Sequence, residues 1–135
     1  MDAAHFLRRT GGLPRALAID LDGTLLRSDG KLSPRTLSVL NHCRAVGVLI
    51  VLATARPPRS VALLVPADLH DVPWICYNGA EVYDRGERIY QRSISPPIGH
   101  HVLWILGELA SQATISVEVD AVRRLPRFGA VKPVC

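Results

Sequence analysis

Two aspartates stand two positions apart at the end of a short apolar run. The run covers residues 16–21 (ALAIDL), the acids are Asp20 and Asp22, and Gly23 follows them. Close carboxylates in apolar surroundings repel each other, so the pKa of one rises unless a cation is present. The pair therefore indicates a bound metal or acid–base chemistry. Gly23 lets the chain turn sharply and come close to a ligand.

Two other interpretations of this pair involve no catalysis. An acidic turn at a strand end would need no ligand at all, and it stays open at this point. A calcium-binding loop is excluded, because it needs a glutamate at its twelfth position and a helix before it. Counting from Asp20, the twelfth residue is Lys31, and a strand is expected before the loop.

Three apolar runs predict buried strands, and helices are expected between them. The strands cover residues 16–21, 48–53 and 74–77. Ser33 is a good N-cap and Pro34 a good first helical residue, so a helix is expected from there to Gly47. Its expected apolar stripe consists of Val39, Leu40, Cys43 and Val46. A shorter helix is expected between residues 58 and 64. This order predicts an α/β fold with a parallel sheet and right-handed crossovers.

Polar residues follow all three predicted strands. Asp20 and Asp22 end the first, Thr54 and Arg56 follow the second, and Asn78 follows the third. Ligands of parallel sheets bind outside the carboxyl ends of the strands. The pattern therefore predicts one site at this edge of the sheet. The unbroken apolar character of residues 48–53 also predicts a strand covered on both faces.

Asn78-Gly79 is a turn signal, and residues 81–83 could fold back as a hairpin. The pattern changes after residue 92. Pro96-Pro97 opens a predicted helix, and apolar and polar residues alternate over 114–120, as in a strand with one face in water. The apolar stripe of this helix consists of Ile98, Val102, Ile105, Leu106 and Leu109. We interpret these residues as the start of a second, α+β unit.

These motifs together resemble the haloacid dehalogenase (HAD) superfamily, Cof-type branch. Residues 20–24 match its DxDGT motif, residues 52–56 (LATAR) its second motif, and residues 78–80 its NGA turn. The resemblance covers about residues 15–120 and implies a HAD-like Rossmannoid parallel sheet with an inserted α+β cap. The expected organisation is an N-terminal extension (1–14), the first three core strands (15–92), the start of the cap (93–120) and an irregular basic tail (121–135).

The resemblance also implies roles for individual residues. Asp20 would attack phosphorus and form an aspartyl-phosphate, and its other oxygen would bind Mg²⁺. Asp22 would act as acid and then as base, while its backbone carbonyl binds the metal. Thr54 would hydrogen-bond the phosphoryl group. Substrate or phosphate contacts are further expected at Arg56, Asn78 and Gly79. Pairing of Arg56 with an acid, as a structural salt bridge, stays equally open, and Asn78 could instead orient the nucleophile.

The implied activity is Mg²⁺-dependent hydrolysis of a small phosphorylated metabolite. Asp22 favours a phosphomonoester such as a sugar phosphate, because that leaving group needs a proton. A phosphomutase shares all of these motifs and stays open as an alternative. A non-catalytic fragment, or an interaction module that uses Trp104 and the basic tail, is the other alternative.

Two parts of the family pattern do not occur in these residues. The resemblance implies a later lysine and a GDxxxD motif, and no GDxxxD occurs here, while Lys132 lies in the tail. From the sequence we expect an incomplete catalytic site and a truncated product or incomplete gene model. We also expect the chain alone to be aggregation-prone or marginally folded, with negligible phosphatase activity, because the strand bearing Asp20 would lie at a sheet edge.

Composition limits the remaining possibilities. The net charge is +4, and residues 121–135 contain four basic residues and no acid, so residues 1–120 sum to zero. The excess belongs to the tail, so neither nucleic-acid nor membrane binding is expected. Three cysteines without a CxxC motif, five histidines without ligand spacing and no apolar run long enough to span a bilayer indicate a cytoplasmic protein. The sequence gives no indication of oligomeric state.

Overall fold

The chain divides into two compact units, Met1–Gln91 and Arg92–Cys135. The computed structural model describes residues 12, 14–109, 115–119 and 122–124. Most of the predicted N-terminal extension and of the predicted tail lie outside these residues. The assignment of the two units as a catalytic core and the start of a cap stays a prediction.

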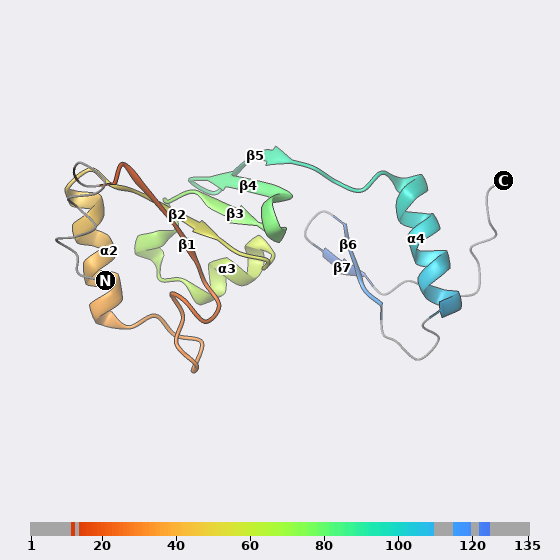
Figure 1. The fold of residues 1–135 in the computed structure, drawn as a ribbon, viewed down its shortest axis with the longest axis horizontal. Helices are drawn as coiled ribbons and strands as arrows, with labels where there is room; N and C mark the ends of the chain where they lie inside the picture. Colours follow the sequence, from red (N-terminus) through yellow and green to blue (C-terminus); the bar gives the residue numbers. More distant parts are fainter. Residues whose placement is uncertain (1–11, 13, 110–114, 120–121, 125–135) are drawn as a thin grey trace. The chain divides into compact units, whose positions relative to one another are not determined.

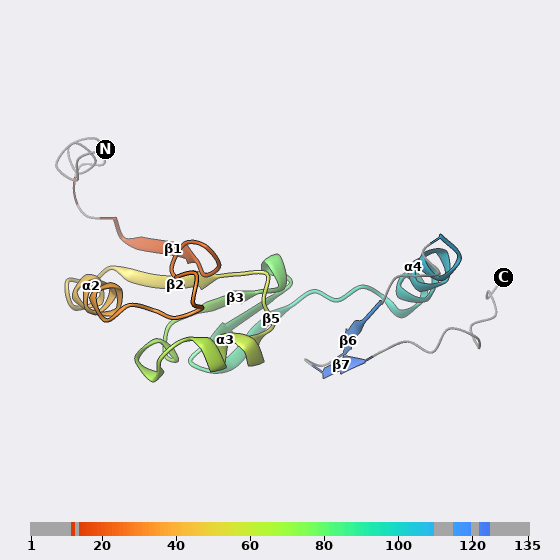
Figure 2. The same ribbon diagram turned by 90° about the horizontal axis from the view of Figure 1, so that it is seen from below.

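The first unit contains a mixed five-stranded sheet, and helices connect its parallel strands (Figures 1 and 2). Its elements in chain order are β1 (Ala16–Asp20), α2 (Pro34–Ala45), β2 (Leu49–Ala53), α3 (Pro58–Leu64), η1 (Ala67–Leu69), β3 (Trp74–Cys76), η2 (Tyr77–Gly79), β4 (Glu81–Asp84) and β5 (Glu87–Gln91).

The strand order within the sheet is β1-β2-β3-β4-β5. β1, β2 and β3 are parallel, with Asp20 opposite Ala53 and Ala53 opposite Ile75. β4 returns antiparallel to β3, as the turn signal at residues 78–79 predicts, and β5 pairs antiparallel with β4. The α/β class and the parallel arrangement of the first three strands are therefore confirmed. Within the described part of the chain β1 lies at one end of the sheet, as predicted.

Helix α2 begins and ends where the sequence signals predict. The Ser33 hydroxyl accepts a hydrogen bond from the Thr36 N–H at 3.0 Å, and Pro34 is the first helical residue. After the helix, Gly47 adopts a φ of 87°, a left-handed conformation that suits glycine. The cap satisfies an N–H group that the helix itself cannot, so this local sequence is enough to fix the helix start.

The core of the first unit lies on one face of the sheet. Ile50 and Leu52 of β2 and Trp74 and Cys76 of β3 are buried there, together with helical residues such as Val61. Side chains on the other face of β2 are exposed or half-buried. The prediction that this strand is covered on both faces is therefore wrong for the described residues, because α2 and α3 supply apolar side chains to the buried face only.

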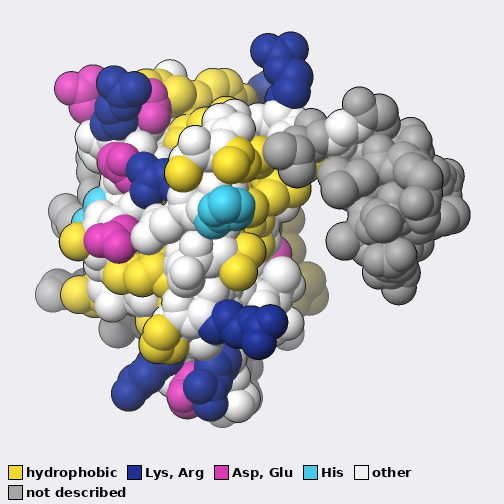
Figure 3. Space-filling view, turned by 90° about the vertical axis from the view of Figure 1, so that its left-hand side faces the viewer, with side chains coloured by type: hydrophobic (Ala, Val, Ile, Leu, Met, Phe, Trp, Pro, Cys, Tyr) yellow, Lys and Arg dark blue, Asp and Glu magenta, His cyan; other side chains and the backbone are white. Residues whose placement is uncertain are grey.

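Part of the predicted stripe of α2 also faces solvent. Leu40 is buried and Cys43 half-buried, but Val39 is 54% and Val46 48% exposed. Figure 3 shows hydrophobic side chains reaching the surface between charged ones on one face of the protein. The periodicity identifies the helix correctly, but the width of its buried stripe depends on where the sheet meets it.

The second unit contains α4 (Pro96–Leu109) and a two-stranded antiparallel sheet of β6 (Val117–Val119) and β7 (Val122–Arg124). No residue of α4 is buried, and the predicted apolar stripe is largely exposed, with Leu109 at 81%. β7 lies in the segment where an irregular tail was expected. No helix in the described parts of the chain is long and apolar enough to cross a membrane.

Candidate active site

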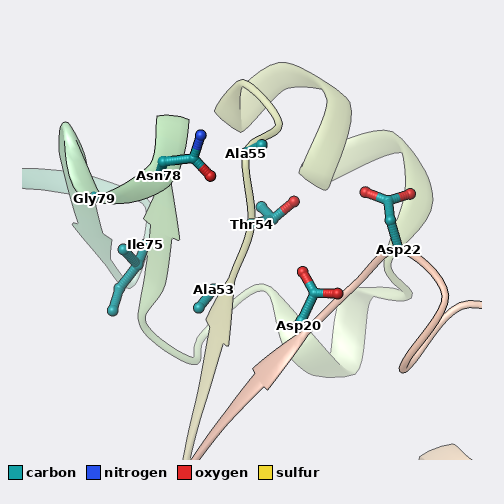
Figure 4. A pocket seen from close by; sticks show the side chains of 8 residues that line it. All are labelled: Asp20, Asp22, Ala53, Thr54, Ala55, Ile75, Asn78 and Gly79. Atoms are coloured by element: carbon teal, nitrogen blue, oxygen red, sulfur yellow. The ribbon is translucent and has the colours of Figure 1, made fainter.

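An open pocket of about 420 Å³ lies at the carboxyl ends of β1, β2 and β3. Figure 4 shows the side chains of Asp20 and Thr54 in its centre, with Asp22 and Asn78 on opposite sides. The complete lining consists of Asp20, Asp22, Ala53, Thr54, Ala55, Ile75, Asn78 and Gly79. The structure therefore brings together five of the six residues singled out from the sequence, and Arg56 is the exception.

A tight turn after β1 presents the two aspartates to the pocket. Gly23 has a φ of 74°, which a residue with a side chain rarely adopts. The Leu25 N–H donates to the Asp20 carbonyl at 3.1 Å, and both Leu25 and Leu26 are buried. Because these leucines anchor the turn in the core, the carboxylate of Asp22 is held at the pocket rim while remaining open to solvent.

Thr54 is the buried polar residue of the site, only 6% exposed. Its N–H donates to the Ile75 carbonyl at 2.9 Å, which continues the pairing of β2 with β3 past the end of the strand. Its Oγ1 accepts the Arg56 N–H at 3.1 Å. The hydroxyl keeps its own hydrogen, so it can still donate to an anionic group in the pocket.

The turn after β3 has an unusual backbone. Tyr77 and Asn78 have φ values of 50° and 54°, and Gly79 follows at 97°. Left-handed conformations are costly for residues other than glycine and persist only where the surroundings impose them, often at functional sites. Here the Asn78 N–H donates to the Thr54 carbonyl at 3.1 Å. This bond fixes the turn against the end of β2, and the Asn78 carboxamide lies at the pocket (Figure 4).

Arg56 pairs with Asp22 instead of lining the pocket. Its Nε and Nη2 donate to the two carboxylate oxygens of Asp22 at 2.8 and 2.7 Å. These hydrogen bonds hold the pKa of Asp22 below its ordinary value. Burial opposes them, and the positive charge of the guanidinium adds a smaller lowering effect. In this arrangement Asp22 is ionised near neutral pH, the form that accepts a proton.

The carboxylate of Asp20 differs from that of Asp22 in its hydrogen bonding. It makes no hydrogen bond or ion pair with any residue that the structure describes, and it points into the pocket (Figure 4). A carboxylate without a partner at the end of a parallel strand is available to attack an electrophile or to bind a cation. The two aspartates of the motif therefore differ chemically although they are two residues apart.

The described residues at the pocket offer few ligands for Mg²⁺. Among the described residues no three His, Cys, Asp or Glu side chains form a group that could hold a metal ion. Mg²⁺, however, often uses one or two carboxylates and keeps several waters. Asp20 supplies a carboxylate at the pocket, and the resemblance adds the backbone carbonyl of Asp22 as a second ligand, whereas Arg56 binds both oxygens of the Asp22 side chain.

Three residues of the lining were not singled out as site residues from the sequence. Ala53 and Ala55 flank Thr54, and Ile75 lies opposite Ala53 in the register of β2 and β3. Their small or apolar side chains give the sequence no chemical signal. The alanines could have been found as neighbours of the buried threonine, whereas Ile75 required the strand register.

A buried acid supports the hairpin of β4 and β5. Glu81, 7% exposed, accepts hydrogen bonds from the Tyr83 hydroxyl at 2.8 Å and from Arg88 at 3.3 Å. Burial, followed by the hydrogen bond to Glu81, raises the pKa of Tyr83 to about 12. Burial and the charge of Glu81 raise the pKa of Cys76 to about 11, so this thiol is protonated and unreactive near neutral pH.

Comparison with known proteins identifies the family. Residues 17–123 match the family model of the haloacid dehalogenase-like hydrolases. The 5-amino-6-(5-phospho-D-ribitylamino)uracil phosphatase of Bacillus subtilis is 32% identical over 80 residues, 59% of this chain and 27% of the relative. The pyridoxal phosphate phosphatase of Escherichia coli is 36% identical over 70 residues, 52% of this chain and 26% of the relative.

A solved structure gives the same result. A haloacid dehalogenase superfamily phosphatase from Bacteroides thetaiotaomicron superposes with a TM-score of 0.69 at 27% identity, over 87% of this chain and 43% of that protein. The chain belongs to the haloacid dehalogenase-like hydrolase family. It spans about a quarter of the length of the two curated relatives.

Proposed function

We propose that this chain carries the nucleophile-bearing half of a phosphatase site that hydrolyses small phosphomonoesters through an aspartyl-phosphate. One observation carries the proposal: Asp20, Asp22, Thr54 and Asn78 line a single pocket at the carboxyl ends of three parallel strands. Membership of a hydrolase family supports it, and so do relatives named as phosphatases of phosphorylated small molecules.

Asp20 is the proposed nucleophile. Its carboxylate attacks phosphorus, the bond from phosphorus to the leaving oxygen breaks, and the phosphoryl group is held on Asp20 until water displaces it. Uncatalysed hydrolysis of phosphate monoesters is extremely slow, and two displacements lower the barrier of each step. The Thr54 hydroxyl and the Asn78 carboxamide are placed to donate hydrogen bonds to phosphoryl oxygens.

Asp22 is the proposed acid and base. In the first step it donates a proton to the leaving alkoxide, and in the second it accepts one from the attacking water. Pairing with Arg56 favours the ionised form, which suits the second step. The first step requires Asp22 to take up a proton, and this loosens its pairing with the guanidinium.

Mg²⁺ is the proposed cofactor. The carboxylate of Asp20 and the backbone carbonyl of Asp22 would hold it, with water and substrate oxygens as further ligands. When bound, the cation neutralises charge that develops on the phosphoryl group.

The test is turnover by the protein at its full encoded length. Hydrolysis of p-nitrophenyl phosphate should be lost with EDTA and restored with Mg²⁺. Asp20→Asn should abolish it, together with the acid-stable phosphoryl label on residue 20, because an amide is not a nucleophile. Retention of turnover or of the label in Asp20→Asn would contradict the proposal.

The role of Asp22 is tested by leaving groups of different acidity. Asp22→Asn should slow alkyl phosphates far more than p-nitrophenyl phosphate, whose leaving group needs little protonation. Equal losses on both substrates would exclude the acid role. A phosphomutase uses the same residues but transfers the phosphoryl group to a second sugar phosphate, so product analysis distinguishes it from a phosphatase.

A further inference from the structure

The contact between Arg56 and Asp22 has the geometry of a fork. Two guanidinium nitrogens meet two carboxylate oxygens at 2.7 and 2.8 Å, which restricts both the position and the orientation of the carboxylate. The side chains are 39% and 51% exposed. Solvent screens the attraction between charges at such exposed positions, whereas the bidentate contact fixes the geometry of the carboxylate.

The backbone of Arg56 is itself held on both sides. Its N–H donates to the Thr54 hydroxyl at 3.1 Å, and its carbonyl accepts the Tyr77 N–H at 3.2 Å. Tyr77 belongs to the left-handed turn that also contacts the Thr54 carbonyl through Asn78. The ends of β1, β2 and β3 are thus joined in one series of contacts, and Arg56 is the residue that extends it to Asp22.

Within the described part of the chain, the side chain of Asp22 depends on this one partner. Asp22 lies in the exposed turn before Gly23, and among the described residues Arg56 is the one side chain that pairs with its carboxylate. Without that partner the side chain could adopt several staggered rotamers. A group that transfers protons must be held close to the atom it serves, so loss of the fork would matter at this position in particular.

We propose that Arg56 is a positioning residue that fixes the carboxylate of Asp22 in one rotamer at the rim of the pocket. The inference rests on the proposed function for its catalytic meaning. It differs from a direct phosphate contact at Arg56, which the sequence left open. Asp22 lines the pocket and Arg56 does not, and both oxygens of Asp22 are bound by the guanidinium.

The first test measures the side chain of Asp22 directly, in the full encoded protein. The couplings of its β-protons in NMR spectra should report a single χ1 rotamer in the unchanged protein and averaging in Arg56→Gln. Arg56→Lys keeps the charge but not the fork and should give partial averaging. Arg44→Gln, which removes another exposed Arg–Asp pair of the same unit, is the matched control and should change nothing at Asp22. A single rotamer in Arg56→Gln would overturn the proposal.

The second test separates positioning from substrate binding by kinetics. Arg56→Gln should lower kcat on an alkyl phosphate by about 10- to 100-fold, the range expected for a misplaced catalytic group. KM should change by no more than roughly twofold, because the substitution does not affect contacts that bind the substrate and the transition state equally. The loss should be smaller on p-nitrophenyl phosphate, and Arg56→Lys should recover part of it. A raised KM with kcat retained would overturn the proposal in favour of a substrate contact.

The two proposals can fail separately. If the unchanged protein shows neither turnover nor phosphorylation of Asp20, the proposed function fails. Averaging of the Asp22 rotamer in Arg56→Gln would then still establish what Arg56 does to the carboxylate. If turnover depends on Asp20 but Arg56→Gln behaves like the unchanged protein on both substrates, the positioning role alone is excluded.

Discussion

The two units of this chain differ in how far their apolar residues are buried. In the first unit Leu21, Leu52, Leu69 and Cys76 have no exposed surface, and a polar pocket lies at the edge of the sheet that they support. In the second unit α4 is rich in apolar residues, yet none of its residues is buried. An apolar helix stabilises a fold only where another element covers its face.

This difference shows what the pocket depends on. Asp20, Thr54 and Asn78 are placed by three parallel strands whose side chains pack under two helices, so their positions follow from a rigid support. Nothing comparable holds the described side chains of the second unit. Substitutions of apolar residues should therefore change the free energy of unfolding strongly in the first unit and weakly in α4.

The largest expected effect is on the free energy of unfolding. Leu52→Ala removes a fully buried side chain and should destabilise the first unit by about 2–5 kcal/mol. The matched variant Leu109→Ala, at a position 81% exposed, should cost less than about 0.5 kcal/mol. Chemical denaturation can follow Leu52→Ala through the fluorescence of Trp74 in the first unit, with Trp104 replaced by Phe, and Leu109→Ala through the fluorescence of Trp104 in the second unit.

Equal losses for the two leucine variants would contradict the comparison. They would mean that α4 is covered as fully as the core of the first unit. The emission of each tryptophan offers an independent check, because Trp74 is 7% and Trp104 42% exposed. Acrylamide should quench Trp104 more strongly.

A smaller effect is expected at the start of α2. Ser33→Ala removes the oxygen that accepts the Thr36 N–H and should cost about 1 kcal/mol. Ser38→Ala, at an exposed position inside the same helix, should be close to neutral or slightly stabilising, because alanine has the higher helix propensity. Denaturation measured as above decides between them, and equal costs would show that the cap does not act as the structure indicates.

The smallest effect concerns alkaline pH. All three tyrosines belong to the first unit, and the pKa of Tyr83 is raised to about 12. A pKa raised in the folded state means that the proton is bound more tightly there than in the unfolded chain. The resulting stability is complete below about pH 10, the ordinary value, and is lost as the pH rises towards 12.

Absorbance of tyrosinate checks this prediction. Tyr83→Phe should remove a late ionisation step near pH 12, whereas Tyr90→Phe, at a position 45% exposed, should leave that step in place. Disappearance of the late step in both variants would show that the alkaline transition is global unfolding.

Much of the fold and the site was predictable because the signals are local. The N-cap at Ser33, the left-handed Gly47 and the turn at Asn78 each act within a few residues, and the structure has all three. The placement of Asp20 and Thr54 at one edge followed from a general property of parallel sheets. The covered faces were predicted less well, because burial of β2 depends on which elements lie against it.

The sequence by itself determined the order of the elements, the residues at the ends of the strands and, through its motifs, the family. Only the tertiary structure decided that Arg56 pairs with Asp22 and that the Asp20 carboxylate has no partner among the described residues. A side chain as long as arginine can reach several neighbours, and the sequence does not specify which one. The choice depends on where the backbone of Arg56 is held. Its N–H donates to the Thr54 hydroxyl and its carbonyl accepts the Tyr77 N–H, and the second contact forms only once β2 and β3 lie side by side.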